Sequence, residues 1–268
     1  MKRKIRAVIR GAGELGSAVA RRLWLAGFEV IALEKPRPTC VRRKVCLANC
    51  IYTGKMKLEE ISAGKAVNLF QTRKFLQQGI LPVLVDPQGE FLKKLKPQIL
   101  VDARMAKKNL GTSIKDAPIV IGLGPGFEAG KDVHYVIETN RGHNLGRVIR
   151  SGKADENTGI PGEIEGFTSQ RVLRAPKKGI FKSNIKIGDF ISRGRIVGWV
   201  NGSPITAQIK GVLRGILRSG LAVNKNSKIG DIDPRGVKSC CFTISDKANA
   251  VAGGVLEAVL TSLSQDKF

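Results

Sequence analysis

The segment from residue 5 to residue 34 constrains the fold more than any other part of the chain. A β-branched strand, Ile5 to Ile9, leads into the sequence GAGELG, and apolar residues then recur at helical spacing up to Gly27. A second strand, Phe28 to Leu33, ends at Glu34, which lies 34 − 11 = 23 positions after the first glycine. A strand, a G-x-G-x-x-G turn, a helix, a strand and an acid, in this order, are typical of dinucleotide-binding sites.

The three glycines of this turn and the acid have distinct expected roles. Gly11, Gly13 and Gly16 would let the backbone approach a pyrophosphate at the amino end of the helix. Glu34 would accept a hydrogen bond from a ribose hydroxyl. The alternative is a tight strand-to-helix turn that binds nothing.

Further buried strands extend this pattern into an α/β layer. Leu81 to Val85 and Ile99 to Asp102 have the composition of parallel strands that are covered on both faces. We therefore predict a Rossmann-like parallel sheet. Arg42 and Arg43, just after Glu34, would either contact a phosphate on the adenosine side of a nucleotide or be solvated.

A second glycine cluster and both histidines lie in the stretch from residue 119 to residue 146. On a straight strand His134 and Glu138 are about 13 Å apart, so one metal ion would not bind both together with Asp132. We expect instead a pocket with the histidines as acid–base groups, or histidines that only hydrogen-bond locally. The candidate residues of this stretch are Gly124, Gly126, His134, Glu138, Arg141 and His143.

Charge is the largest deviation in composition. The 268 residues include 46 Lys and Arg against 22 Asp and Glu, a formal net charge of +24. Such a chain favours anionic partners: phosphorylated cofactors, nucleic acid or an acidic protein surface. Nucleic acid ranks last, because the cations are spread along the chain and aromatic residues make up 5%.

The amino terminus and the cysteines indicate the compartment. The sequence MKRKIRAVIRGAG is basic with a short apolar run, so we expect neither a signal peptide nor a membrane span, and a cytoplasmic location. The five cysteines are then expected to be reduced thiols. Cys40, Cys46 and Cys50 match no metal-binding spacing and are expected to be buried and inert.

The second half of the chain contains an internal repeat. Residues from Ala175 recur from Ala207 with a constant offset of 207 − 175 = 32 and no gap, and Asn201-Gly202 between the copies is a hairpin signal. The spacing resembles the lipoyl/biotinyl barrel-sandwich fold, but the hairpin lacks that family's modifiable lysine, which argues against a swinging-arm carrier. We predict domains at residues 1–152, 171–235 and 236–268, the last being a strand and a helix that pack back on the first.

Nearly the whole chain resembles the YqeB family, associated with selenium-dependent molybdenum hydroxylases, and its first half is similar to the XdhC/CoxI maturation factors. The motifs that carry this resemblance are RGAGELG at residues 10–16, PTCVRR at 38–43, IGLGPGFEAGKDVHYVIETNRGHNLGRVI at 121–149, GDIDPRG at 230–236 and CFTISDKA at 241–248. The resemblance implies a protein that helps to mature or insert molybdenum cofactor, as molybdopterin or its dinucleotide, into a hydroxylase apoprotein, with no settled reaction. Cys240 would be a sulfur relay or a soft metal contact, or simply a buried thiol. The alternatives are an NAD(P)-dependent oxidoreductase and a non-catalytic docking scaffold.

Overall fold

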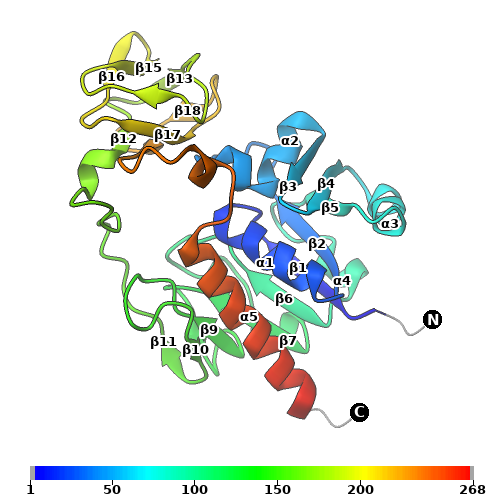
Figure 1. Ribbon diagram of the computed structural model, residues 1–268. Helices are drawn as coiled ribbons and strands as arrows, with labels where there is room; N and C mark the ends of the chain where they lie inside the picture. Colours follow the sequence, from blue (N-terminus) through cyan, green and yellow to red (C-terminus); the bar gives the residue numbers. More distant parts are fainter. Residues whose placement is uncertain (1–3, 266–268) are drawn as a thin grey trace. The chain divides into compact units, whose positions relative to one another are not determined.

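The computed structural model describes residues 4–265 and divides into two compact units (Figure 1). The sheet unit contains the chain up to Pro38, Leu47–Asn157 and the chain from Ile244. The repeat unit contains Thr39–Cys46 and Thr158–Thr243. The first three and last three residues, which the predicted domains 1–152 and 236–268 include, lie outside the described part.

A nine-stranded sheet forms the centre of the sheet unit. Its strand order is β10-β9-β7-β6-β1-β2-β5-β4-β3. The strands are β1 (Arg6–Arg10), β2 (Glu29–Glu34), β3 (Lys55–Leu58), β4 (Ile61–Ala66), β5 (Leu81–Val85), β6 (Ile99–Asp102), β7 (Ile119–Leu123), β9 (Tyr135–Ile137) and β10 (Val148–Ile149). The strands from β9 to β4 pair in parallel, and the strand order reverses between β1 and β6.

Both edges of this sheet are antiparallel. At one edge β3 and β4 form a hairpin, in which Glu59 adopts the left-handed conformation with φ 48°. At the other edge β10 returns antiparallel to β9. Neither connection contains the helical crossover that a parallel neighbour requires.

Helices cover both faces of the sheet. On one face, α1 (Glu14–Leu25) packs against α5 (Asp246–Gln265), which also contacts β7, β9 and β10. On the other face, apolar side chains from alternate positions of the strands form a core with α3 (Leu69–Gln77) and α4 (Leu92–Leu95). The small strands β8 (Glu128–Ala129) and β11 (Gly152–Lys153) pair with each other beside this sheet. The four-residue helix α2 (Cys50–Thr53) precedes β3.

The repeat unit consists of two four-stranded antiparallel sheets, with strand orders β12-β19-β17-β14 and β16-β15-β13-β18. The strands are β12 (Val172–Arg174), β13 (Gly179–Lys182), β14 (Phe190–Ile191), β15 (Ile196–Val200), β16 (Ser203–Thr206), β17 (Gly211–Ile216), β18 (Ala222–Val223) and β19 (Lys228–Asp233). An offset of 32 residues converts each strand of the first copy into its counterpart in the opposite sheet. At Asn201-Gly202 both residues have positive φ, as expected for a two-residue hairpin.

The predicted fold class, a Rossmann-like parallel sheet followed by a lipoyl-like barrel-sandwich domain, is wrong. The chain has a large mixed sheet of nine strands, with further antiparallel sheets and a carboxy-terminal helix. The strand predicted just before that helix is also absent, because Lys238–Cys241 forms a single 3-10 turn. In the described part of the chain, no helix combines the length and the hydropathy needed to span a membrane.

Candidate functional site

The candidate site lies where the parallel strands of the sheet unit end. Strands β1, β2, β6, β7 and β9 run in the same direction, so the loops that follow them emerge together at the carboxyl ends of the strands. This row of strand ends is the carboxyl edge of the sheet. Between β1 and β6 the connections leave in opposite directions, because the strand order reverses there. In open α/β sheets, ligands bind in the crevice at such a point.

Two glycines of the first turn are required by close packing. A side chain at Gly16 would place its Cβ 1.9 Å from the carbonyl oxygen of Gly11. Gly11 has φ +97° and lies against the backbone of Ala103 and Arg104, which follow β6. These glycines let α1 start directly against the ends of β1 and β6.

Gly13 differs, because nothing in the chain requires a glycine at this position. Its φ and ψ of −68° and −169° are open to any residue, and an added Cβ would meet no atom within 4 Å. Gly13 is also the N-cap of α1, so no side chain caps the N–H groups of the first turn. The amino end of α1 therefore combines open space at Gly13 with a first turn that no side chain caps, which suits the approach of an anion.

The Glu34 carboxylate lies beside this turn. It accepts hydrogen bonds from the backbone N–H groups of Ala12, at 2.9 Å, and Lys35, at 2.8 Å. An ionised carboxylate has about four acceptor positions, so these two bonds leave capacity for a ligand hydroxyl. Glu34 thus stabilises the turn and is half-buried at its rim.

A buried polar network that the sequence patterns did not predict lies under the same edge. Arg10 and Asp102 end the adjacent strands β1 and β6, and Thr112 donates to the Asp102 carboxylate at 2.6 Å while accepting from Arg10 at 3.1 Å. Arg104 donates to Asp102 through Nε and Nη2. Burial by itself raises the pKa of Asp102, but the hydrogen bonds from Arg104 and Thr112 outweigh it and hold the pKa below its usual value. The signal in the sequence was a charged residue ending each of two apolar strands.

The glycines of the second cluster lie at the same edge of the sheet, but they allow packing. A Cβ at Gly124 would come within 2.4 Å of the Thr139 hydroxyl, and one at Gly126 within 2.7 Å of the Lys108 backbone. The N–H of Gly124 donates to the carbonyl oxygen of Ile137. The close approach of an anion to backbone N–H groups is therefore better supported at Gly13 than at Gly124 and Gly126.

His134 lies at the amino ends of the strands, opposite the carboxyl edge, because it precedes β9 and pairs with Val120 near the start of β7. Its imidazole Nδ1 accepts from the backbone N–H of Val120 at 3.0 Å, and the backbone N–H of His134 donates to the Val120 carbonyl oxygen. Burial lowers the pKa of its imidazole. The structure therefore separates His134 from Glu138 and Glu34, which lie at the other ends of their strands.

Glu138 follows β9 and holds the loop that leads to β10. Its carboxylate is buried and accepts from the backbone N–H groups of Asn140, at 2.6 Å, and Asp155, at 2.8 Å. Arg141 forms an ion pair with Asp246 at the start of α5, and His143 is exposed in the following turn. Glu138 and Arg141 lie at the carboxyl edge of the sheet, where Glu138 stabilises the loop after β9 and Arg141 links this loop to α5.

The start of α5 brings one further cation to this edge. Ser245 donates to the Glu14 carboxylate at 2.8 Å, which places the beginnings of α5 and α1 together. Burial and the nearby Arg141 lower the pKa of Lys247, against the opposing effects of Glu14, Glu138 and Asp246. Lys247 is thus a half-buried amine among charged groups near the open end of α1.

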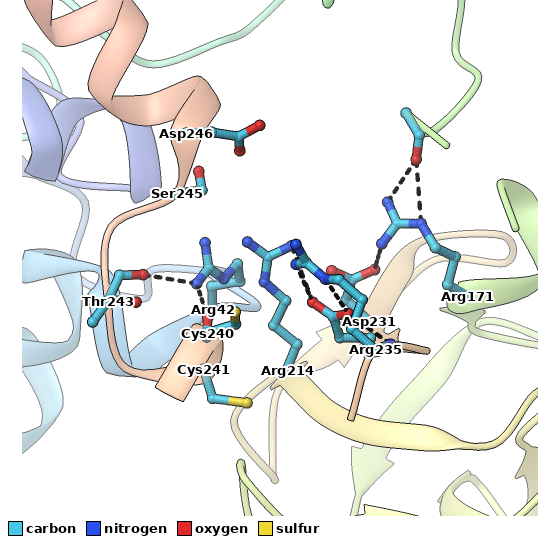
Figure 2. Close-up of polar contacts among 12 residues, drawn as sticks. Arg42, Arg171, Arg214, Asp231, Arg235, Cys240, Cys241, Thr243, Ser245 and Asp246 are labelled. Carbon is cyan, nitrogen blue, oxygen red and sulfur yellow. Dashed lines mark hydrogen bonds and ion pairs between the residues drawn. The ribbon is translucent and has the colours of Figure 1, made fainter. Parts of the chain in front are cut away.

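Cys240 belongs to the repeat unit. Its carbonyl oxygen accepts from Arg42 at 2.7 Å, and Arg42 also donates to Thr243 (Figure 2). Arg43 donates to the carbonyl oxygen of Ile216, so both arginines predicted as phosphate contacts hold the repeat unit together. Cys240 is half-buried.

The other thiols and acids indicate no metal site. Cys46, Cys50 and Cys241 are buried, and burial raises the pKa of Cys50 to about 12 and also raises that of Cys241. Asp233 is fully buried and accepts from Arg235 through both carboxylate oxygens. Within residues 4–265, no group of three or more His, Cys, Asp or Glu side chains is placed to bind a metal ion.

Comparison with known proteins gives one strong relative. Over 258 residues, 96% of this chain, the sequence is 50% identical to the uncharacterized protein YqeB of Escherichia coli. This match supports the YqeB family. The chain spans 48% of the length of that relative. A search against models of protein families finds no match.

Similar solved structures are remote. An aspartoacylase family protein from Mesorhizobium loti is 15% identical, with 85% of this chain and 84% of that one covered and a TM-score of 0.27. A succinylglutamate desuccinylase/aspartoacylase from Rhodobacter sphaeroides is 16% identical over 32% of this chain and 29% of its own, with a TM-score of 0.21. Because their TM-scores are so low, these matches support no statement about the activity of this chain.

The predicted role in molybdenum cofactor maturation for a selenium-dependent hydroxylase is wrong on these comparisons. The curated relative is uncharacterized, and none of the comparisons gives evidence of molybdenum cofactor or of a selenium-dependent hydroxylase. A hydroxylase apoprotein as partner has no support either.

Proposed function

We propose that the sheet unit binds a dinucleotide of the nicotinamide class, with its pyrophosphate at the amino end of α1. The observation that supports this most directly is Gly13, an N-cap glycine with open space in front of it that no packing contact explains. A residue without a side chain at this position lets a pyrophosphate approach the first-turn N–H groups. We assign no reaction to the site.

Glu34 favours NAD over NADP as the ligand. Its carboxylate lies at the end of β2 and bonds to the turn through Ala12. An acid in this place accepts from the ribose 2′-hydroxyl of NAD and repels the 2′-phosphate of NADP. We expect NADH to bind about tenfold or more tightly than NADPH, since 1.4 kcal/mol of differential interaction corresponds to a factor of ten.

Gly13→Asp tests the site without a steric cost to the fold. The Cβ enters open space, and Asp is a better N-cap than Gly by a few tenths of a kcal/mol. The carboxylate would, however, occupy the donors and repel the pyrophosphate. We expect NADH affinity, measured by nicotinamide fluorescence, to fall at least about tenfold while the urea midpoint stays equal or rises.

Asn68→Asp is the matched control, because it adds the same charge at the exposed N-cap of α3, on the opposite face of the sheet from α1. It should leave NADH affinity within about twofold of the unmodified chain. Equal affinity for NADH in the Gly13→Asp variant and the unmodified chain would overturn the proposal. So would a failure of the unmodified chain to bind either NADH or NADPH.

A further inference from the structure

The two sheets of the repeat unit are related by the internal repeat, yet their outer faces differ in burial. Ile180 corresponds to Val212 and Trp199 to Asp231, each at an offset of 32 residues. Ile180 and Trp199 are 41% and 39% exposed, whereas Val212 and Asp231 are each 3% exposed. Equivalent positions on one fold are therefore covered in one copy and open in the other.

The sheet β12-β19-β17-β14 is the covered sheet, and β16-β15-β13-β18 is the open sheet. Two segments of the chain outside the repeat pack on the covered sheet. Val41 packs on Gly215 so closely that a Cβ there would meet it at 2.9 Å, and Arg43 donates to the Ile216 carbonyl oxygen. The 3-10 turn Lys238–Cys241 lies against β17. As a result all six residues of β17 are buried. The sequence uses these two segments once, so the opposite sheet lacks an equivalent cover among the described residues.

The open sheet presents an apolar outer face. Trp199 on β15 pairs with Lys182 on β13 and with Pro204 on β16, so the three side chains form one row across the sheet. Ile180 pairs with Ala222 beside this row. Cross-strand neighbours lie about 5 Å apart and present one surface. The apolar face consists of Ile180, Ile196, Trp199, Pro204 and Ala222, which are all exposed.

The charge around the apolar face has one sign. From Phe190 to Gly230 the sequence contains no Asp or Glu, and neither does the segment from Gly166 to Gly188. All four strands of the open sheet lie within these two segments. Exposed cations surround the strands: Lys177, Lys178, Lys182, Arg193, Arg195 and Lys225. An interface with an apolar centre and a rim of one charge selects a partner of the opposite charge.

We propose that the apolar face of the repeat unit docks an acidic segment of another protein, with apolar side chains of that segment against Trp199. A second copy of this chain fits poorly, because its net charge is also strongly positive. Single-stranded nucleic acid fits poorly too, since stacking successive bases requires several rings and Trp199 is the one aromatic residue of this face. An exposed Trp suits this role, because Trp is enriched among the residues that contribute most of the binding energy at protein interfaces.

Labelled peptides test this docking. The probe is a fluorescein-labelled peptide of Glu-Leu-Glu repeats, compared with oligoglutamate of equal length and with labelled oligothymidylate. We expect the Glu-Leu-Glu peptide to bind most tightly in fluorescence anisotropy. Trp199→Ala and Lys182→Glu should each weaken it about tenfold or more, as substitutions at interface centres do.

Matched controls lie in the sheet unit. Trp24→Ala removes the other tryptophan and Lys93→Glu reverses an exposed charge on α4, so both should leave peptide affinity within about twofold. Circular dichroism of Trp199→Ala should match the unmodified chain, because the side chain is exposed. Equal binding of oligoglutamate, or binding unchanged by Trp199→Ala, would show plain charge attraction and overturn the proposal. Tighter binding of oligothymidylate, or a dimer in sedimentation that Trp199→Ala removes, would overturn it as well.

Discussion

At the scale of single residues, we expect the buried carboxylate of Asp102 to contribute strongly to the free energy of unfolding. It is 1% exposed at the carboxyl end of β6 and accepts from both Arg104 and Thr112. Removing one partner of a buried ion pair leaves the other charge uncompensated, at a cost of about 3–5 kcal/mol. Because part of Arg104 reaches solvent, we expect Asp102→Asn to lower the free energy of unfolding by about 2–3 kcal/mol at neutral pH.

The pH dependence of this effect has a definite sign. The folded pKa of Asp102 lies below its unfolded value, so its contribution is complete above the unfolded pKa and is lost as the pH falls through the folded pKa. Urea unfolding should therefore show a gap between the two proteins at pH 7 that narrows in acid. Glu257→Gln, which removes an exposed carboxylate from α5, should show no such gap. A constant gap at every pH would contradict the assignment.

The places of Gly13 and Glu34 in the fold were predictable, because the order of strand, turn, helix and strand around them is a local pattern. Gly13 and Glu34 lie at the ends of β1 and β2, as the strand, turn, helix, strand order indicates. His134 lies at the wrong edge for that site because it precedes β9, whereas Gly13 follows β1 and Glu34 ends β2. Arg10 and Asp102 were missed since a single sequence does not show that two strand ends 92 residues apart are adjacent.

At the scale of elements, the contact between α5 and the turn after β9 depends on Gly254. A Cβ there would meet the carbonyl oxygen of Gly146 at 2.1 Å, which forces the backbone to move. At the neighbouring Gly253 a Cβ meets nothing within 4 Å. We expect Gly254→Ala to destabilise the protein by about 1–3 kcal/mol and Gly253→Ala to stabilise it by up to about 1 kcal/mol.

These two variants control each other, because they make the same change at adjacent positions of one helix. Urea unfolding followed by circular dichroism would measure both free energies. Equal values for the two alanine variants would show that α5 does not pack on the turn at Gly146.

Several elements were predictable because their patterns are local. Leu81–Val85 and Ile99–Asp102 match the strands β5 and β6, and the 32-residue repeat matches the two antiparallel sheets. The direction of the edge strands was not predictable in this way. It depends on the tight turn at Glu59 and the long loop after Glu138, neither of which has the Asn-Gly type of hairpin signal.

At the scale of the whole molecule, each unit contains pieces from both sides of the connection between them. The segment Thr39–Cys46 belongs to the repeat unit, although it is flanked by residues of the sheet unit. In the same way α5 belongs to the sheet unit, although it follows the repeat unit. The intervening stretch from Asp155 to Ile160 is exposed and has no helix or strand. A cut in this stretch would therefore leave each unit built from two fragments.

We expect endoproteinase Glu-C to cut first at Glu156, Glu163 or Glu165, since exposed irregular backbone is the preferred site of nicking. The two fragments should separate in a denaturing gel and yet elute together, at the position of the intact chain, in native size-exclusion chromatography. The sheet unit would retain α5 through Val251, Val255 and Val259, which are fully buried and contribute about 1.5–3 kcal/mol each. Mild urea should split the nicked protein into two peaks at a concentration that leaves the intact chain folded. Two separate peaks in native buffer would mean that these shared segments do not hold the units together.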